Sequence, residues 1–291
     1  MLAVKFEWTF YDRGITESLP RGLCFIGDPH TPGAPRDHHL DTLSRAIRAA
    51  SDRGLVPVML GNLFQSPQEA APTLFSSLFR IFHRSLYRPI ANLGSRDKHG
   101  ALLTPDCALW VLAESGAVSV THNARTRALL IDLEDGPMAL YAVPHGQNVP
   151  NAVDSLCPPE RTVVITHFDG TLHEVRGASL LVNGHTRDPA GVQVLGGTVC
   201  VNSGIIRVDG RQVHAPALWT WQPGQRTPDH HLLRHLPAAP AFDLAAVPDE
   251  ELAAGMTEDG ALDDAREARA LYMLEQEAPQ EADEPSPSCG A

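Results

Sequence analysis

The sequence lacks several features that would assign it to a specialised class of protein. It has no run of about 18 apolar residues, so no membrane span and no membrane partner are predicted. Its beginning shows no basic region followed by an apolar stretch, so we expect no signal peptide and a cytoplasmic location. No C-x-x-C pair occurs, and the 5 cysteines are widely spaced, which argues against a disulfide framework or a zinc ribbon. We expect reduced, mostly buried cysteines.

The formal charge is concentrated at one end of the chain. The 291 residues carry a net charge of −12, and region 238–291 alone holds fourteen acidic residues and two arginines. The rest of the chain is therefore neutral overall. A neutral body gives no general electrostatic attraction for nucleic acid.

Composition divides the chain into two parts. Residues 1–237 have the size and the apolar content of one domain with a substantial core. Region 238–291 is an acidic, Pro/Ala-rich tail, for which we predict a helix at about 259–277 and a disordered end. The simpler interpretation of this tail is a solvating segment, and the alternative is a docking segment for a basic protein partner.

Apolar runs and helical patterns alternate in the first half of the chain. Strands are predicted at 23–26, 55–60, 89–93 and 117–121. Helices are predicted at 39–50, 73–86 and 104–115, the last with Thr104 as N-cap and Pro105 as its first residue. This alternation predicts a mostly parallel, buried sheet.

The second half is rich in predicted strands. The turn sequence from Glu134 to Pro137 joins runs 128–133 and 138–143, which predicts a hairpin. Further strands are predicted at 162–166 and 179–183, and an antiparallel meander at 192–195, 198–202, 205–208 and 212–221. We therefore expect two sheets packed together with helices outside.

Polar clusters follow five of the apolar runs. Because open α/β sheets bind ligands at the carboxyl ends of their strands, such clusters are candidate sites. A single Asp-x-His pair is as often a surface loop, but five clusters in order are much rarer by chance. The clusters are Gly27-Asp28-Pro29-His30, Gly61-Asn62-Leu63-Phe64, Gly94-Ser95-Arg96-Asp97, Thr166-His167 and Asn183-Gly184-His185-Thr186-Arg187.

The order of these clusters resembles the calcineurin-like metallophosphoesterase superfamily. Its pattern is D-x-H, G-D-x-x-D, G-N-H-D/E, a lone H and G-H-x-H, followed by N-x-G, which here corresponds to Asn202-Ser203-Gly204. The resemblance covers Leu23 to Val208. It implies an α/β fold, a four-layer αββα sandwich of two mixed β-sheets flanked by helices, with a two-metal site at the strand ends. The segment Tyr141 to Pro150 resembles a loop of the DNA-repair exonuclease branch, which would make the protein nuclease-like.

The resemblance also implies a ligand set for divalent metal. Four residues match the family's ligands, namely Asp28, His30, His167 and His185. Asn62 stands where the family has the aspartate that bridges two metals. An amide oxygen is neutral and holds two dications together poorly, so one ion is expected rather than two.

Three other positions depart from the family pattern. Ser95 replaces an asparagine ligand, Arg96 replaces the histidine that protonates the leaving group, and Arg187 replaces the last histidine of G-H-x-H. A guanidinium stays protonated and does not ligate metal. We predict that Ser95, Arg96 and Arg187 bind phosphate and that both arginines stabilise charge in catalysis, unless they only pair with neighbouring aspartates. His99 is a candidate to replace the lost catalytic histidine.

Three functions follow from this incomplete site. The first is a metal-dependent phosphodiester or phosphomonoester hydrolase that uses Mn²⁺, with Zn²⁺ or Fe as alternatives. The second is a metal-free protein whose arginines bind a phosphate ester or a nucleic-acid end without cutting it. The third is a catalytically inactive scaffold for a protein partner.

Overall fold

The computed structural model describes residues 7–14, 16–31, 37–68, 71–121, 127–185, 191–204, 206 and 217–233. All of them belong to the first of two units, Met1–Ala239 and Pro240–Ala291. The predicted acidic tail, 238–291, and its helix at 259–277 lie outside the described residues and stay predictions. None of the described helices is both long enough and apolar enough to cross a bilayer.

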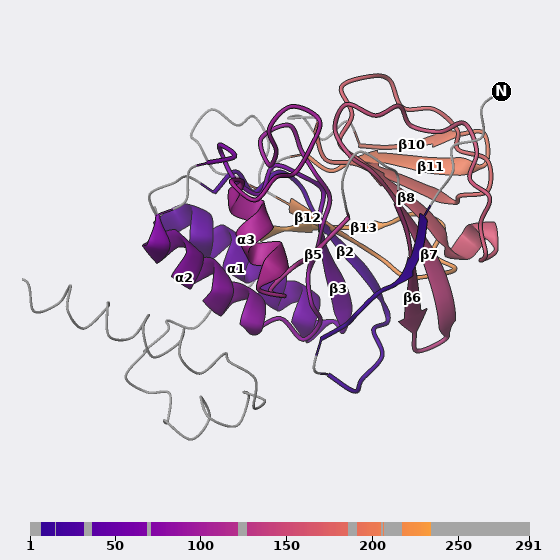
Figure 1. Ribbon diagram of the computed structural model, residues 1–291. Coiled ribbons are helices and arrows are strands. Elements are labelled where there is room, and N and C mark those ends of the chain that lie inside the picture. Colours follow the sequence, from indigo (N-terminus) through magenta and orange to yellow (C-terminus); the bar gives the residue numbers. More distant parts are fainter. Residues whose placement is uncertain are drawn as a thin grey trace, which may run out of the picture. The chain divides into compact units, whose positions relative to one another are not determined.

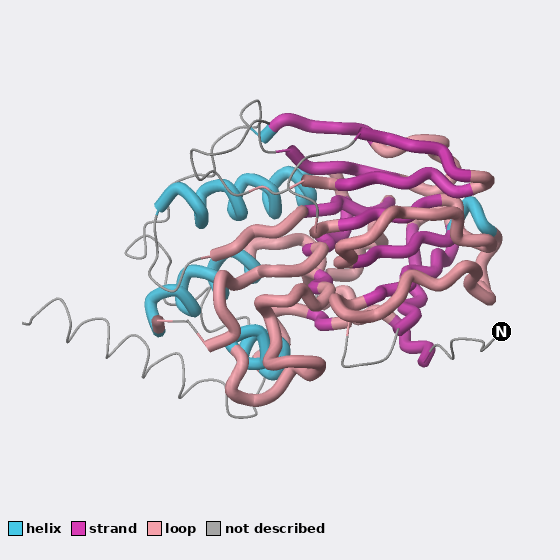
Figure 2. Tube along the Cα trace, turned by 90° about the horizontal axis from the view of Figure 1, so that it is seen from above, coloured by secondary structure: helices cyan, strands magenta, loops and turns pink. Residues whose placement is uncertain are grey.

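Two mixed β-sheets pack face to face at the centre of the first unit (Figures 1 and 2). One contains, in order, β13 (Asp229–Leu232), β12 (Ala217–Trp221), β2 (Gly22–Ile26), β3 (Leu55–Met59), β4 (Ile90–Ala91) and β5 (Ser119–Val120). The other contains β1 (Glu7–Phe10), β6 (Arg127–Leu133), β7 (Gly136–Val143), β8 (Thr162–Thr166), β9 (Leu180–Asn183), β11 (Thr198–Asn202) and β10 (Gly191–Leu195).

Side chains of the central strands alternate between two cores, one between the sheets and one under the helices. In β2, Leu23 and Phe25 point into the core between the two sheets, whereas Cys24 and Ile26 face the helices. All four side chains are fully buried. Successive side chains of a strand point to opposite faces, so a strand buried on both sides needs a continuous apolar run. This is why the runs found in the sequence predict β2, β3 and β8 well.

The outer faces of the two sheets are covered differently. The helices α1 (Asp37–Asp52), α2 (Pro72–His83) and α3 (Ala108–Glu114) lie over the six-stranded sheet (Figure 1). Over the seven-stranded sheet, the described cover consists of loops and the short 3-10 helix η1 (Pro159–Arg161). There Val149 and Val175 pack against Tyr141. The predicted α/β fold with two mixed sheets is confirmed, and loops supply most of the fourth layer in the described part of the chain.

The predicted start of α3 is wrong by three residues. The helix begins at Ala108 with Cys107 as its N-cap, not at Pro105 with Thr104 as its N-cap. The Thr104 hydroxyl donates to the Asp106 carboxylate, and the Cys107 N–H donates to the Thr104 carbonyl, 2.9 Å away. Residues 104–107 therefore close a separate turn, in which the hydroxyl satisfies a side chain instead of a helix N-terminus.

The predicted antiparallel meander after residue 191 is confirmed only for its first two strands, and residues 205, 207–208 and 212–216 of the other two lie outside the described part of the chain. β10 and β11 pair antiparallel, but β11 pairs with β9 in parallel, and β12 lies in the other sheet beside β2. The pattern of side chains identifies a strand but not its partner. Strands β1 and β13 were not predicted. His230 and His231 lie on β13.

Candidate metal centre

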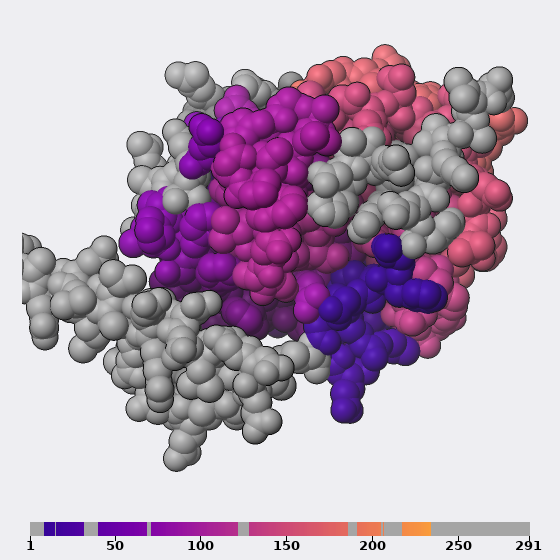
Figure 3. All heavy atoms as spheres, in the orientation of Figure 1, coloured from indigo at the N-terminus to yellow at the C-terminus, as the bar shows by residue number. Residues whose placement is uncertain are grey.

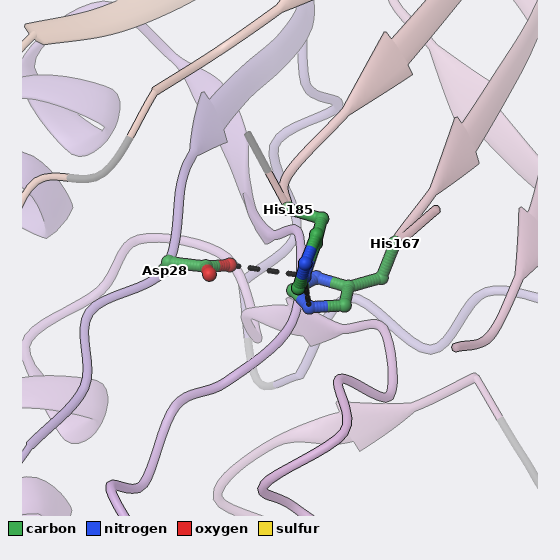
Figure 4. A group of neighbouring side chains, drawn as sticks. All are labelled: Asp28, His167 and His185. Carbon is green, nitrogen blue, oxygen red and sulfur yellow. Dashed lines mark hydrogen bonds and ion pairs between the residues drawn. The ribbon is translucent and has the colours of Figure 1, made fainter. Parts of the chain in front are cut away.

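The carboxyl ends of neighbouring strands bring four predicted ligands to one place. Asp28 follows β2, Asn62 follows β3, His167 follows β8 and His185 follows β9. The Asp28 and His167 side chains are almost fully buried, and His185 is partly exposed. Figure 4 shows Asp28, His167 and His185 converging from opposite sides. One candidate ligand atom from each of these three residues lies within 4.8 Å of the others.

Backbone strain is concentrated at this centre. Among the described residues, the non-glycine residues with positive φ are Asp28 (28°), His30 (46°) and Asn62 (48°). A side chain in this region of φ costs roughly 1–3 kcal/mol, so it persists where the surroundings enforce it, as at functional sites. All three strained residues belong to the predicted metal site.

Gly61 allows the loops to approach each other this closely. Its φ is +132°, and a Cβ built on it would lie 2.5 Å from Nδ1 of His167. The glycine before Asn62 is therefore required by both the backbone conformation and the neighbouring ring.

His167 is held in the tautomer of a metal ligand. Its Nδ1 lies 3.2 Å from the Leu60 carbonyl, and because a carbonyl only accepts, Nδ1 carries the proton. Nε2 therefore presents a lone pair to the centre. Burial is the main cause that lowers the pKa of His167 to about 4; Asp28 opposes this shift, and the rings of His185 and His145 contribute to it. The ring is thus neutral at pH 7, which ligation requires.

His185 is oriented in the same way by a carboxylate. Its Nε2 pairs with Oδ1 of Asp169, so Nε2 carries a proton and Nδ1 faces inward. This inner nitrogen lies 2.9 Å from Nε2 of His167. Two ligands of one tetrahedral ion at 2.0–2.1 Å are about 3.4 Å apart, so the two rings are almost in the arrangement that an ion needs.

Asn62 lies between Asp28 and His167 as a hydrogen-bond donor. Its Oδ1 accepts the Arg96 backbone N–H at 2.9 Å, which fixes the orientation of the amide. Its Nδ2 then donates to Oδ2 of Asp28 and to Nε2 of His167, both at 3.0 Å. The sequence predicted a neutral oxygen ligand here, but the structure turns the amide nitrogen toward the centre.

Acceptors outnumber donors at the centre. After Asn62 has donated its two hydrogens, Oδ1 of Asp28 is buried without a hydrogen bond, 3.4 Å from Nδ1 of His167, and Nδ1 of His185 faces another lone pair. His30 lies next to Asp28, with its Nε2 3.4 Å from Oδ2, and its buried Nδ1 also lacks a partner. Buried acceptors that face one another are costly unless a cation satisfies them. These residues therefore fit a divalent cation.

The loop after β4 is tied to the centre from two sides. The buried Asp97 carboxylate accepts N–H groups from Gly94 at 2.8 Å and from Phe64 at 3.3 Å. Burial raises the pKa of Asp97 to about 6. Lys98 donates to the His145 carbonyl at 2.7 Å. These contacts hold the Arg96 N–H against Asn62.

The remaining predicted residues lie farther from the centre or outside the described part. Ser95 Oγ is 3.5 Å from Oδ1 of Asn62, whereas the Arg96 guanidinium donates to the Gln65 carbonyl at 3.0 Å and not to Asp97. His99 pairs with Asp106 at 3.3 Å. Arg187 lies outside the described residues, so its predicted role is untested.

Two functional candidates were missed from the sequence. His145 and His185 pair with the two carboxylate oxygens of Asp169, and the His145 ring centroid lies 5.8 Å from that of His167. His145 follows the end of β7, so the strand-end rule applied to that strand would have found it. Asp169 lies two residues after His167, but nothing in the sequence indicates that its carboxylate reaches His185.

No family model and no curated protein matches the sequence. Among solved structures, an archaeal phosphodiesterase is similar, with 13% identity over 72% of this chain and 98% of its own, at a TM-score of 0.42. A 5'-nucleotidase precursor from Thermus thermophilus has 14% identity over 88% of this chain and 59% of its own, at 0.43. The Haemophilus influenzae NAD nucleotidase has 10% identity, 88% and 60% coverage, and 0.45.

The chain spans only about 60% of the length of the two nucleotidases. At these identities and TM-scores, the likeness carries no argument about activity, which has to come from the residues of the site.

Proposed function

We propose that this protein binds one divalent cation through Asp28, His167 and His185 and acts on a phosphate ester at that ion. The observation that carries the proposal is the convergence of buried acceptors at the strand ends, with the outer nitrogens of both histidines already held by Leu60 and Asp169. A carboxylate with two imidazoles is a common set for Mn²⁺, Zn²⁺ or Fe. Mn²⁺ is the ion we expect.

One ion fits better than two. The Asn62 oxygen accepts the Arg96 N–H, so the amide turns its nitrogen toward Asp28 and His167, and an amide nitrogen does not ligate a second ion. At the position where the resembled family has a carboxylate shared by two ions, this chain therefore has a neutral hydrogen-bond donor. Among the described residues, Asp28 is the one carboxylate that contacts the Asn62 amide nitrogen.

The protein's own groups would hold and orient the ester. When bound, the cation polarises a phosphoryl oxygen and supplies an activated water. Asp28, His167 and His185 hold the ion in place, and Asp169 keeps His185 oriented. The Ser95 hydroxyl lies at the edge of the centre and is placed to donate to a phosphoryl oxygen. Strained loops fix these groups before the ester arrives, which is what electrostatic preorganisation requires.

Binding without hydrolysis is the second candidate, and one observation favours it. Arg96 was proposed to stabilise charge and His99 to protonate the leaving group, but Arg96 donates to the Gln65 carbonyl and His99 pairs with Asp106. A site that lacks a proton donor would retain an ester and cleave it slowly. Phosphate esters or nucleic-acid ends would then be ligands.

The test combines metal content with hydrolysis of bis-(p-nitrophenyl) phosphate and p-nitrophenyl phosphate. Mn²⁺-dependent turnover that is lost together with the metal in His185→Ala supports the hydrolase. Phosphate or oligonucleotide binding that needs Mn²⁺ but gives no turnover supports the second candidate. Turnover that persists in His185→Ala contradicts the assigned site.

A further inference from the structure

A second group of metal-binding side chains lies in the loop between β4 and α3. His99, Asp106 and Cys107 each offer a ligand atom within 4.8 Å of the other two. All three lie outside the centre formed by Asp28, His167 and His185. The isolated bridge between His99 and Leu102 and the turn before Cys107 fold this loop back on itself.

The His99 ring faces the carboxylate with an unsatisfied atom. Its Nε2 lies 3.3 Å from Oδ2 of Asp106, yet the nitrogen is buried without a hydrogen-bond partner. The other carboxylate oxygen accepts the Thr104 hydroxyl, which orients the Asp106 side chain. Oδ2 is thus the carboxylate oxygen that faces His99.

Cys107 closes the group from the core side. Its Sγ lies 3.4 Å from the Thr104 hydroxyl oxygen, so the same threonine positions both the thiol and the carboxylate. The cysteine is buried, whereas the His99 and Asp106 side chains are 38% and 60% exposed. Figure 3 shows the segment around α3 at the molecular surface. An ion could therefore enter from solvent and reach the thiol.

We propose that His99, Asp106 and Cys107 form a second metal site, selective for Zn²⁺ or an ion of similar softness. One nitrogen, one oxygen and one sulfur ligand suit a borderline ion such as Zn²⁺ or Co²⁺, whereas Mn²⁺ has little preference for a thiolate. Three protein ligands leave a fourth position for water. His99 then serves as a ligand and not as the catalytic residue that the sequence suggested.

The site would stiffen the loop that supports the first centre. His99 directly follows Asp97 and Lys98, which tie the loop to Gly94, Phe64 and His145. An ion that joins His99 to the start of α3 would fix the far end of the same loop. The second ion would therefore restrict the motion of the loop beside the first centre and would take no part in the reaction there.

Cobalt absorption distinguishes the two sites. A sulfur-to-cobalt charge-transfer band arises only where a thiolate is a ligand, and no cysteine belongs to the first centre. We expect the full-length protein to show this band with one equivalent of Co²⁺ when His185→Ala has removed the first centre. Cys107→Ser should abolish it, whereas Cys200→Ser, at another buried cysteine, should keep it.

Asp106→Asn provides a second variant at an exposed position where folding is not at risk. We expect its Co²⁺ affinity at this site to fall at least about tenfold. A His185→Ala protein without the band, or a band that survives Cys107→Ser in that background, overturns the proposal. The band together with absent Mn²⁺-dependent turnover would instead contradict only the proposed function.

Discussion

Nε2 of His167 lies 2.9 Å from Nδ1 of His185, while the outer nitrogen of each ring faces an acceptor, the Leu60 carbonyl for one and Asp169 for the other. Each acceptor fixes a tautomer, and both tautomers direct a lone pair inward. The two rings are therefore oriented as ligands before any ion arrives. This relationship makes the outer acceptors testable independently of the ligands.

Replacing Asp169 by Asn should weaken metal binding without removing a ligand. The carboxylate orients His185 and increases its basicity, and losing such a partner typically costs about 10–100-fold in affinity. The Mn²⁺ dissociation constant of Asp169→Asn should rise by this factor in isothermal titration calorimetry. Asp132→Asn, at an exposed position of β6, is the matched control. Equal affinities of the two variants would contradict the assigned role of Asp169.

Asn62→Asp should make the stability of the protein depend on metal. The new carboxylate would lie beside Asp28 in place of a donor that is 3.0 Å from it, so like charges would repel in the metal-free protein. We expect a lower melting temperature without metal and a larger increase on adding Mn²⁺ than in the wild type.

Asn62→Ala controls for the loss of the amide hydrogen bonds alone. It should lower the melting temperature without any gain in the response to Mn²⁺. Scanning fluorimetry with and without chelator measures both effects. A response to Mn²⁺ in Asn62→Asp no larger than that of the wild type would mean that the ion does not approach residue 62.

The sequence predicts the strand ends better than the details around them. The buried strands β2, β3 and β8 are continuous apolar runs, and each is followed by a residue of the centre, so Asp28, Asn62 and His167 could be placed from the pattern. The hairpin of β6 and β7 was predicted from its turn and is confirmed. Local sequence carries both kinds of signal.

Long-range partners could not be predicted in this way. Strand β12 lies in the six-stranded sheet because it pairs with β2, almost two hundred residues earlier in the chain. The orientation of the Asn62 amide depends on the Arg96 backbone N–H, a donor that every residue except proline carries. A pattern of side chains contains no information on such contacts.

Gly94→Ala should destabilise the fold because the backbone of a neighbouring loop occupies the space. A Cβ on Gly94 would lie 2.3 Å from both the backbone N and Oδ1 of Asn62. Overpacking of this kind costs about 1–3 kcal/mol in the free energy of unfolding, and here it would also displace Asn62. Urea unfolding measures the loss, and Mn²⁺ titration should show weaker binding.

Gly197→Ala is the matched control for this substitution. Its Cβ would meet only the Glu174 carboxylate oxygen, at 3.6 Å, which is an ordinary contact. We expect a change within about 0.5 kcal/mol, as is usual for surface positions. Similar losses in the two variants would show that the close approach at Gly94 is not what matters.

Buried Asp97 should make stability depend on pH between about 4 and 6. Its pKa of about 6 lies above the usual value of 3.8, so the native state binds the proton more tightly than the unfolded state. This contribution is fully present below the unfolded pKa and is lost as pH rises through the folded pKa. The difference of about two pKa units corresponds to about 3 kcal/mol.

The prediction is best tested as a difference between the wild type and Asp97→Asn, both with chelator. The variant lacks the titrating group, whereas other groups such as His167 titrate in both proteins and cancel. The free energy of unfolding of the wild type, relative to the variant, should fall by about 2.4 kcal/mol from pH 4 to pH 7, since part of the full effect is already lost at pH 4. A difference that does not change over this range would mean that the Asp97 carboxylate stays ionised and that its two backbone donors outweigh its burial.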